Sequence, residues 1–197
     1  MTSTVDVDVA VLVLAAGAST RFGSPKPLAD VGGRPLLARA ISEIQQWAPG
    51  KVVVVLGAEA DLVCKVIPDD IEIVVCADWE SGMSASLAAG IEAVAADPSI
   101  ARCAVMMGDT LGVTASDAAR VLEVSTMYPD IVMQATFEGE PSHPVVFPRE
   151  LFDSLLELSG DSGARDLLAS GNVDVVAVPL EASTPIDVDT RADLPDV

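Results

Sequence analysis

The sequence predicts an α/β fold, with residues 1–197 forming a single three-layer αβα domain around a mostly parallel sheet. Short apolar runs rich in β-branched residues alternate with segments of helical periodicity. The length suits one domain with a proper core, and the chain shows no linker, internal repeat or low-complexity stretch. Hydrophobic residues make up 50% of the chain but aromatic residues only 4%, so we expect a core of Val, Leu, Ile and Ala.

The predicted strands are nearly continuous apolar runs, which is typical of strands buried on both faces. They cover residues 7–14, 51–57, 71–76, 101–107, 131–137, 145–147 and 173–178. Because helices separate most of them, we expect a doubly wound, Rossmann-like sheet that binds ligands at the carboxyl ends of its strands. The loops after Leu14, Met107 and Phe137 are therefore expected to carry the chemistry.

The predicted helices follow from apolar spacing and from one capping signal. The first has an apolar face formed by Leu36, Leu37, Ala40, Ile41, Ile44 and Trp47. Others are expected at residues 83–96, 150–158 and 163–169. Thr114 is a predicted N-cap for a helix that ends near Met127, and Asp117 suits its first turn.

Charge and cysteine content exclude several classes of protein. The formal net charge is −19, so the surface repels nucleic-acid backbones and anionic lipid, and we expect neither a nucleic acid nor a membrane as partner. We interpret the acidity itself as a solubility or salt adaptation. Cys64, Cys76 and Cys103 lack the spacing of a disulfide framework or zinc site. With no signal-peptide pattern and no apolar run long enough to span a bilayer, we expect a cytoplasmic protein.

The segment L-A-A-G-A-S-T-R-F-G-S-P-K, residues 14–26, follows the first predicted strand. Its small side chains would let backbone N–H groups approach an anion, and Arg21 and Lys26 add positive charge. It is not a P-loop, because five residues separate Gly17 from Gly23 and proline follows Lys26. The dinucleotide fingerprint G-x-G-x-x-G is also absent.

This segment resembles the signature L-A-[AG]-G-x-S-x-R-[MF]-G-x-x-K of nucleotidyltransferases with a GT-A-like α/β fold. Among these it looks most like the molybdenum cofactor cytidylyltransferase and guanylyltransferase group, and the resemblance covers nearly the whole chain. It implies that the loop amides and the two cations hold the nucleotide phosphates and that the preceding residues line the base. The implied phosphate-binding residues are Gly17, Ala18, Ser19, Arg21 and Lys26, and the implied base-lining residues are Leu14, Ala15 and Ala16.

The segment W-E-S-G-M-S-A-S-L, residues 79–87, resembles the G-M-S-x-S-L segment of the same group. Taken alone, its serines could either recognise a polar ligand or cap the helix that they open. The resemblance implies a nucleotide pocket that includes Gly82, Met83, Ser84 and Ser86. Cytidylyltransferases usually read L-A-A-G and G-M-S-x-S, whereas guanylyltransferases read L-A-G-G and G-P-L-A-G. The resemblance therefore favours CTP over GTP.

The segment V-M-M-G-D-T places Asp109 at the carboxyl end of a predicted buried strand. A carboxylate there suits a Mg²⁺ ligand, although a solvated loop acid or a helix cap would have the same pattern. The resemblance matches Asp109 to the metal-binding acid of a G-D-Q-P motif. Thr110 and Leu111 replace Gln and Pro, which leaves the pterin acceptor open.

The segment P-I-D-V-D-T-R-A-D-L, residues 185–194, resembles the terminal motif [IV]-D-[IV]-D-T-P-E-D-L. On a strand, Asp187 and Asp189 would point to opposite faces, so only one could reach the metal. The family pattern favours Asp189 as the metal ligand and leaves Asp187 second.

Two further motifs concern the acceptor. P-S-H-P-V-V-F resembles P-x-G-H-P-V-x-F, and we expect its His143, the single histidine, to shape the acceptor pocket rather than act as a base. G-D-S-G-A-R matches G-D-x-G-A-R, so Arg165 either positions an acceptor phosphate or lies on the surface of a capped helix. A serine-protease reading of G-D-S-G fails because the fold pattern and neighbouring residues are wrong.

The expected activity is a Mg²⁺-dependent transfer of CMP from CTP to molybdopterin or molybdenum cofactor, with Arg21, Lys26 and Asp109 as the catalytic residues. Such an enzyme would also make transient contact with a molybdoenzyme. GTP as donor and a sugar phosphate as acceptor remain alternatives. From another class, a non-catalytic cofactor carrier or insertion chaperone is also compatible with the fold.

Overall fold

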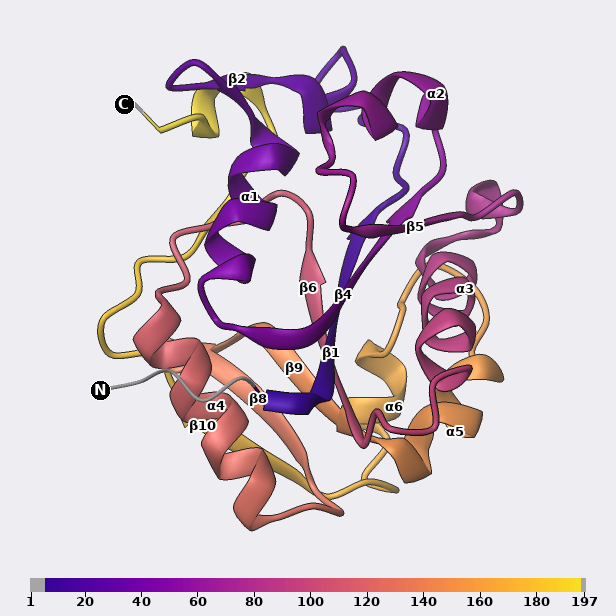
Figure 1. The fold of residues 1–197 in the computed structure, drawn as a ribbon, viewed down its shortest axis with the longest axis vertical. Helices are drawn as coiled ribbons and strands as arrows, with labels where there is room; N and C mark the ends of the chain where they lie inside the picture. Colours follow the sequence, from indigo (N-terminus) through magenta and orange to yellow (C-terminus); the bar gives the residue numbers. More distant parts are fainter. Residues whose placement is uncertain (1–5, 196–197) are drawn as a thin grey trace.

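The computed structural model describes residues 6–195 and contains a seven-stranded sheet in the order β10-β8-β9-β6-β1-β4-β5 (Figure 1). All neighbouring strands pair in parallel except β9, which runs antiparallel to both β6 and β8. This confirms the mostly parallel α/β fold. The strands are β1 (Asp6–Ala15), β4 (Pro49–Leu56), β5 (Glu72–Val75), β6 (Arg102–Met107), β8 (Val132–Phe137), β9 (Glu140–Pro148) and β10 (Val175–Pro179).

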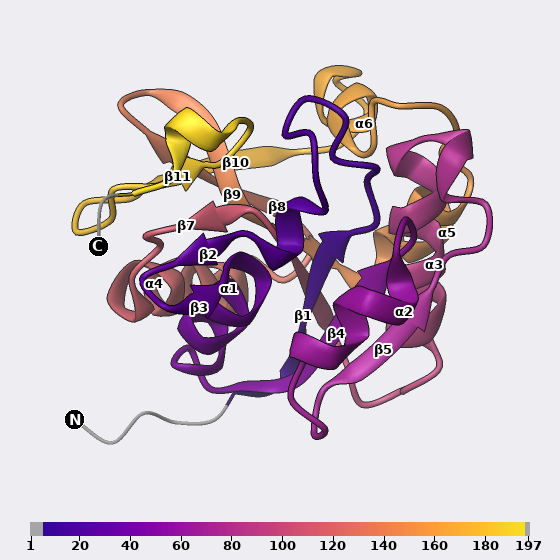
Figure 2. The same cartoon turned by 90° about the horizontal axis from the view of Figure 1, so that it is seen from above.

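The sheet is buried on both faces, and its interior strand β1 is apolar at every position from Val9 to Ala15. Along β1, Val9, Val11 and Val13 belong to one apolar cluster, while Ala10, Leu12 and Leu14 belong to another. The first cluster is covered by α1 (Leu36–Gln45), α2 (Ala60–Val63) and α4 (Ala115–Met127). The second is covered by α3 (Met83–Ala95), α5 (Phe152–Leu156) and α6 (Arg165–Ala169). Figures 1 and 2 show α1 and α4 on one side of the sheet and α3 and α5 on the other.

Helix boundaries follow local chemistry. The N-cap prediction is confirmed, since the Thr114 side chain accepts a hydrogen bond from the Asp117 N–H at 3.3 Å. The predicted helix at residues 163–169 begins only at Arg165, because Gly163 has a φ of 56°, which a helix cannot contain. The predicted helix at 150–158 is instead a 3₁₀ turn (Arg149–Leu151) that runs into α5.

Three two-residue strands, β2, β3 and β7, were not predicted, since such short pieces carry no periodic pattern, and the strand expected around Asp187 is only two residues long. Strands β2 (Asp30–Val31) and β3 (Arg34–Pro35) form a hairpin whose two turn glycines both have positive φ. Strand β7 (Thr110–Leu111) pairs with β11 (Ile186–Asp187) in antiparallel fashion. The second pair matters most, because it brings the carboxyl-terminal segment beside the end of β6.

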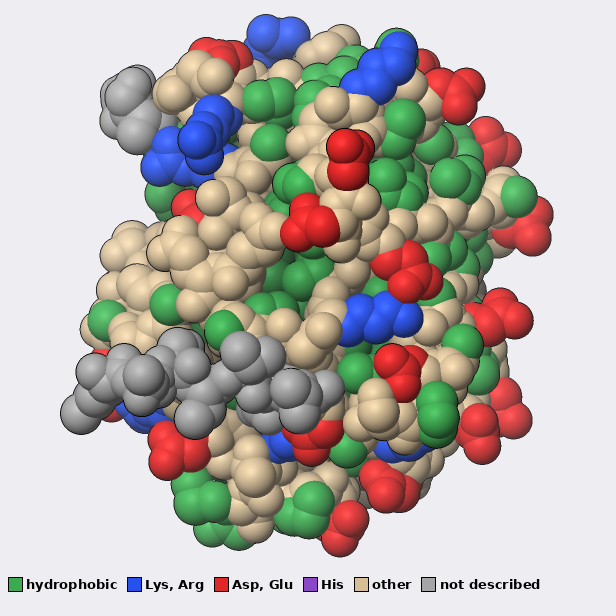
Figure 3. All heavy atoms as spheres, viewed as in Figure 1, with side chains coloured by type: hydrophobic (Ala, Val, Ile, Leu, Met, Phe, Trp, Pro, Cys, Tyr) green, Lys and Arg blue, Asp and Glu red, His purple; other side chains and the backbone are tan. Residues whose placement is uncertain are grey.

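The surface reflects the acidic composition. In the view of Figure 3, acidic side chains follow much of the right-hand edge of the molecule. Several basic side chains lie toward the top of the same view. Among residues 6–195, no helix is both long enough and apolar enough to cross a membrane.

Candidate functional site

The loop after β1 is folded onto Ser19. Ser19 has a φ of 56°, and its carbonyl accepts hydrogen bonds from the N–H groups of Phe22 and Gly23 at 3.0 and 3.1 Å. Its hydroxyl accepts a third from the Lys26 N–H at 3.0 Å. Gly17 and Ala18 are left exposed in front of this turn. The loop therefore has a defined shape in which small residues face solvent, as a phosphate cradle requires.

Two basic side chains of this loop meet two acidic side chains from other segments. The Lys26 ammonium is in direct contact with the Asp109 carboxylate and lies 3.8 Å from Asp189. Arg21 makes two contacts of 3.0 Å with Asp189. The Lys26 and Asp109 side chains are only 16% and 24% exposed, whereas Arg21 is 74% exposed. The inner pair is therefore the better shielded from water, and the outer pair contributes little to stability.

The two carboxyl-terminal aspartates differ in their partners. Strand β11 ends at Asp187, so the expectation that Asp187 and Asp189 alternate along one strand is wrong. Asp187 accepts a hydrogen bond from the Thr110 hydroxyl at 2.5 Å, whereas Asp189 binds Arg21. Thr110, which stands where the family motif has Gln, thus occupies one oxygen of Asp187. Asp189 is the carboxylate that shares Lys26 with Asp109.

His143 lies on β9 near these acids. Burial lowers the pKa of His143, and the charges of Asp187 and Asp109 act in the opposite direction without reversing the shift. Its imidazole is consequently neutral near pH 7. A neutral His143 ring beside the acids is compatible with a role in shaping the acceptor pocket. That role stays a prediction.

The start of α3 is tied to the segment before α6. Gly82 has a φ of 112°, and a Cβ there would lie 2.5 Å from the Gly160 carbonyl oxygen, which accepts a hydrogen bond from the Ser84 N–H. Neither predicted serine caps the helix, since the N-cap is Gly82. Ser84 is fully buried, and its hydroxyl has no hydrogen-bond partner among the described residues. Ser86 is also buried, whereas Met83 is exposed.

For the other predicted site residues, all of them among the described residues, the structure gives the burial but no side-chain contact with the four charged residues. Leu14 and Ala16 are buried at the end of β1, and Ala15 is partly buried. Arg165 is exposed at the first position of α6. The structure thus joins Arg21, Lys26, Asp109 and Asp189 directly.

The MobA-like NTP transferase domain family matches residues 11–175. The chain belongs to this family. Nicotine blue oxidoreductase from Paenarthrobacter nicotinovorans is 34% identical over 191 residues, which is 91% of each chain. Rv0371c from Mycobacterium tuberculosis H37Rv is 30% identical with a TM-score of 0.85, over 98% of this chain and 96% of that one. Rv0371c in complex with manganese is 26% identical with a TM-score of 0.79, over 94% and 95% of the two chains.

In this MobA-like chain, a buried acid outside every motif fixes the carboxyl-terminal segment. The Asp117 carboxylate accepts hydrogen bonds from the N–H groups of Glu181, Ala182 and Ser183 at 3.2, 2.8 and 2.8 Å, and from the Ser183 hydroxyl at 2.7 Å. Burial raises its pKa, but these hydrogen bonds outweigh burial, so the pKa of Asp117 lies below its usual value. No local sequence pattern predicts these partners, which lie 64 to 66 positions from Asp117.

Further hydrogen bonds continue from Asp117 toward the candidate site and join the carboxyl-terminal segment to residues 109–114. The Ser183 hydroxyl accepts a hydrogen bond from the Thr114 N–H at 3.0 Å, and the Thr184 N–H donates to the Gly112 carbonyl at 3.2 Å. The Val188 N–H donates to the Asp109 carbonyl at 3.1 Å. This hydrogen-bonded seam holds Asp189 opposite Asp109 in the MobA-like fold.

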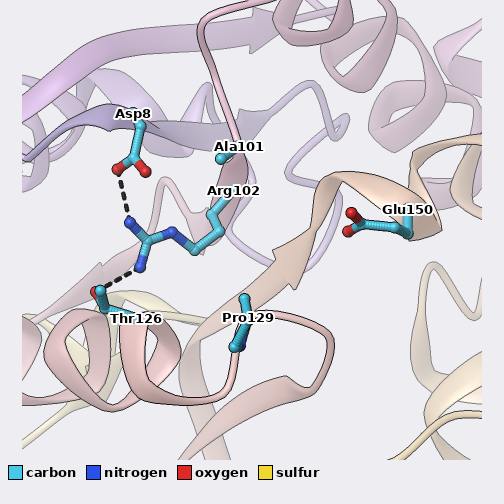
Figure 4. Close-up of a pocket in the computed structure, with 6 residues that line it drawn as sticks. All are labelled: Asp8, Ala101, Arg102, Thr126, Pro129 and Glu150. Atoms are coloured by element: carbon cyan, nitrogen blue, oxygen red, sulfur yellow. Dashed lines mark hydrogen bonds and ion pairs between the residues drawn. The ribbon is translucent and has the colours of Figure 1, made fainter.

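Two surface hollows lie at the other end of the sheet, where strands begin. One, of about 170 Å³, is lined by Asp8, Ala101, Arg102, Thr126, Pro129 and Glu150 (Figure 4). Arg102 in its wall is bonded to Asp8 at 2.6 Å and to Thr126 at 2.5 Å. The other, of about 390 Å³, lies beside the Lys51–Glu72 ion pair. Neither hollow includes a residue of the MobA-like signature loop.

Proposed function

We propose that this chain is a divalent-metal-dependent nucleotidyltransferase that moves CMP from CTP to a molybdopterin-type acceptor and releases pyrophosphate. The observation that carries the proposal is the contact of Lys26 with Asp109, with Asp189 and Arg21 beside them. Transfer from a triphosphate needs cations for the phosphates next to carboxylates for a metal. We also propose that residues 1–197 act as one nucleotidyltransferase domain.

The acidic residues fit a magnesium ion bound partly by substrate. Mg²⁺ usually takes one or two protein carboxylates and completes its shell with phosphate oxygens and water. Among the described residues, no group of three or more His, Cys, Asp or Glu side chains could hold a metal, so the proposed ion would need substrate oxygens and water as further ligands. Asp109 and Asp189 would hold the ion, with Asp187 second. The bound ion would neutralise charge on the phosphates, and the manganese complex of the relative Rv0371c supports a divalent metal.

The protein side chains would act mainly by positioning and by charge. An oxygen of the acceptor phosphate attacks the α-phosphorus of CTP, and the bond to the bridging oxygen breaks as pyrophosphate leaves with the electron pair. A phosphate monoester is already anionic, so little acid–base help is needed. Lys26 and Arg21, once released from their carboxylates, would stabilise the charge that develops on pyrophosphate.

The proposed donor and acceptor follow from the sequence motifs around the site. The L-A-A-G and G-M-S-A-S segments favour CTP, and GTP is the alternative donor. Thr110, which donates a hydrogen bond to Asp187, stands where the family motif has Gln. Because this difference lies near the acceptor, a sugar phosphate is the alternative acceptor. A non-catalytic cofactor carrier would bind nucleotide or cofactor without turnover.

A second candidate function is an oxidoreductase, because the relative named nicotine blue oxidoreductase matches 91% of the chain. Such an activity would change the oxidation state of nicotine blue in the presence of an added reductant or oxidant. It would not release pyrophosphate from CTP, so one assay distinguishes the two.

The test is pyrophosphate release by purified protein with Mg²⁺ and molybdopterin, comparing CTP with GTP. We expect release selective for CTP, and a loss of roughly 10²–10³ in rate for both Lys26→Ala and Asp109→Ala. Arg120→Ala, which removes a surface ion pair with Glu181, serves as the control and should keep the wild-type rate. Near-normal turnover in either site variant would refute the assignment. Nucleotide binding without release would favour another acceptor first and a carrier second. A redox change of nicotine blue without pyrophosphate release would favour the second candidate.

A further inference from the structure

A third cation lies against the signature loop. Arg191 occupies the position at which the terminal D-T-P-E-D motif of the resembled family has proline. Its guanidinium donates a hydrogen bond to the Ser24 hydroxyl at 3.1 Å and lies 5.4 Å from the centroid of the Phe22 ring. Ser24 and the buried Phe22 both belong to the loop that begins at the end of β1. Arg191 therefore joins the metal-binding segment to the loop expected to bind phosphates.

Arg191 differs from the two cations of the loop because its positive charge is not paired with a carboxylate among the described residues. Arg21 is paired with Asp189, and Lys26 is paired with Asp109. Within residues 6–195, Arg191 forms no ion pair, and its contacts are a hydroxyl and an aromatic face. A guanidinium carries five N–H donors, so the hydrogen bond to Ser24 leaves others available. Among residues 6–195, the signature loop thus has beside it a cation that is in no ion pair.

The backbone beside Arg191 is fixed. One oxygen of Asp193 accepts hydrogen bonds from the N–H groups of Asp189 and Thr190 at 3.2 and 2.7 Å, and from the Thr190 hydroxyl at 2.8 Å. This capping box sets the turn that begins at Arg191, two residues after the candidate metal ligand Asp189. A cation held in this way is oriented before substrate arrives, which reduces the entropy lost on binding.

We propose that Arg191 is an additional ligand of the NTP polyphosphate in this chain, alongside Arg21 and Lys26. The inference rests on the proposed function, because it needs a triphosphate in the signature loop. Guanidinium groups bind phosphate oxygens through charge-assisted, often two-point hydrogen bonds. Arg191 supplies that chemistry next to Asp189 without first having to leave a carboxylate. It distinguishes polyphosphate from monophosphate and does not read the base.

The test is calorimetric binding of CTP, CMP and inorganic pyrophosphate, each with Mg²⁺, to the wild-type chain and to Arg191→Gln. Loss of a charge-assisted contact should weaken CTP and pyrophosphate binding about tenfold. CMP binding should stay within about twofold of wild type, because CMP lacks the phosphates that this contact serves. Arg191→Lys, which keeps the charge but loses the fork, should restore binding in part. Arg120→Gln is the matched control, since it removes one arginine from the Arg120–Glu181 pair and should bind all three ligands as wild type does.

The outcomes separate the inference from the function on which it rests. Wild-type affinity for CTP and pyrophosphate in Arg191→Gln, while the wild-type chain binds both, overturns the inference alone. An equal loss for CMP and CTP also overturns it, because Arg191 would then only hold the loop in shape. If the wild-type chain binds neither CTP nor pyrophosphate, the proposed function itself is refuted together with the role of Arg191.

Discussion

Replacing Asp117 by alanine should destabilise the fold and loosen the segment that carries Asp189. The four hydrogen bonds that its carboxylate accepts come from residues of different exposure. Ser183 is buried, so its N–H and hydroxyl would lose their acceptor without gaining water, whereas the N–H groups of the exposed Glu181 and Ala182 can be rehydrated. Hydrogen bonds to a charged group contribute about 1.5–3 kcal/mol each and are not additive, so we expect a cost of about 2–4 kcal/mol.

Thermal unfolding of Asp117→Ala measures this cost. In a domain of this size it corresponds to a fall in Tm of roughly 5–15 °C. Asp153→Ala, which removes an exposed aspartate from the first turn of α5, is the control for a simple helix-terminus effect and should change stability by less than about 1 kcal/mol. Equal Tm changes in the two variants would refute the view that Asp117 fixes the 181–183 segment.

The same variant has a defined pH dependence. Because folding lowers the pKa of Asp117, its stabilising contribution is fully present above the ordinary aspartate pKa of about 3.9 and is lost as the pH falls through the lower folded value. The difference in free energy of unfolding between wild type and Asp117→Ala should therefore be constant from about pH 5 to 8 and shrink below about pH 4. A difference that grows as the pH falls would contradict the assignment.

Two further predictions concern the core. In Gly90→Ala the new Cβ would lie 2.4 Å from a methyl carbon of Leu12 and 2.9 Å from one of Val55, so overpacking of about 1–3 kcal/mol should exceed the gain in helix propensity and lower the Tm; an unchanged Tm would contradict this packing. Burial raises the pKa of the Cys103 thiol to about 12, whereas Cys64 is partly exposed. A thiol reagent at pH 8 should therefore label Cys64 in the native protein and Cys103 only on unfolding, and rapid native labelling of Cys103 would oppose this.

Periodicity in the sequence was enough to predict the layers of the fold. From Val9 to Leu14 the run that became β1 has no polar residue to face solvent, so it belongs inside a sheet covered on both sides. The face from Leu36 to Ile44 repeats at helical spacing, and Thr114 supplies the oxygen that starts α4. These features depend on neighbours within one or two turns of chain, which is the range that sequence patterns report.

The connections across the candidate site depend on pairs that lie far apart along the chain. Thr110 and Asp187 are 77 positions apart, and Asp117 and Ser183 are 66 apart. Strands of two residues leave no alternation from which such pairing could be read. The family resemblance selected Asp109 and Asp189, but only the three-dimensional arrangement shows that Lys26 lies between them and that Arg191 reaches the same loop.

The position of β1 between β6 and β4, inside the sheet, also constrains how the chain acquires its structure during synthesis. This strand leaves the ribosome before either of its partners, β4 and β6, and it is apolar on both faces. Until Met107 has been translated, at least one of its backbone edges has no strand to pair with, and such an edge is a template for aggregation. The contact of the loop residue Lys26 with Asp109, which follows β6, likewise cannot form on a nascent chain that ends before Asp109.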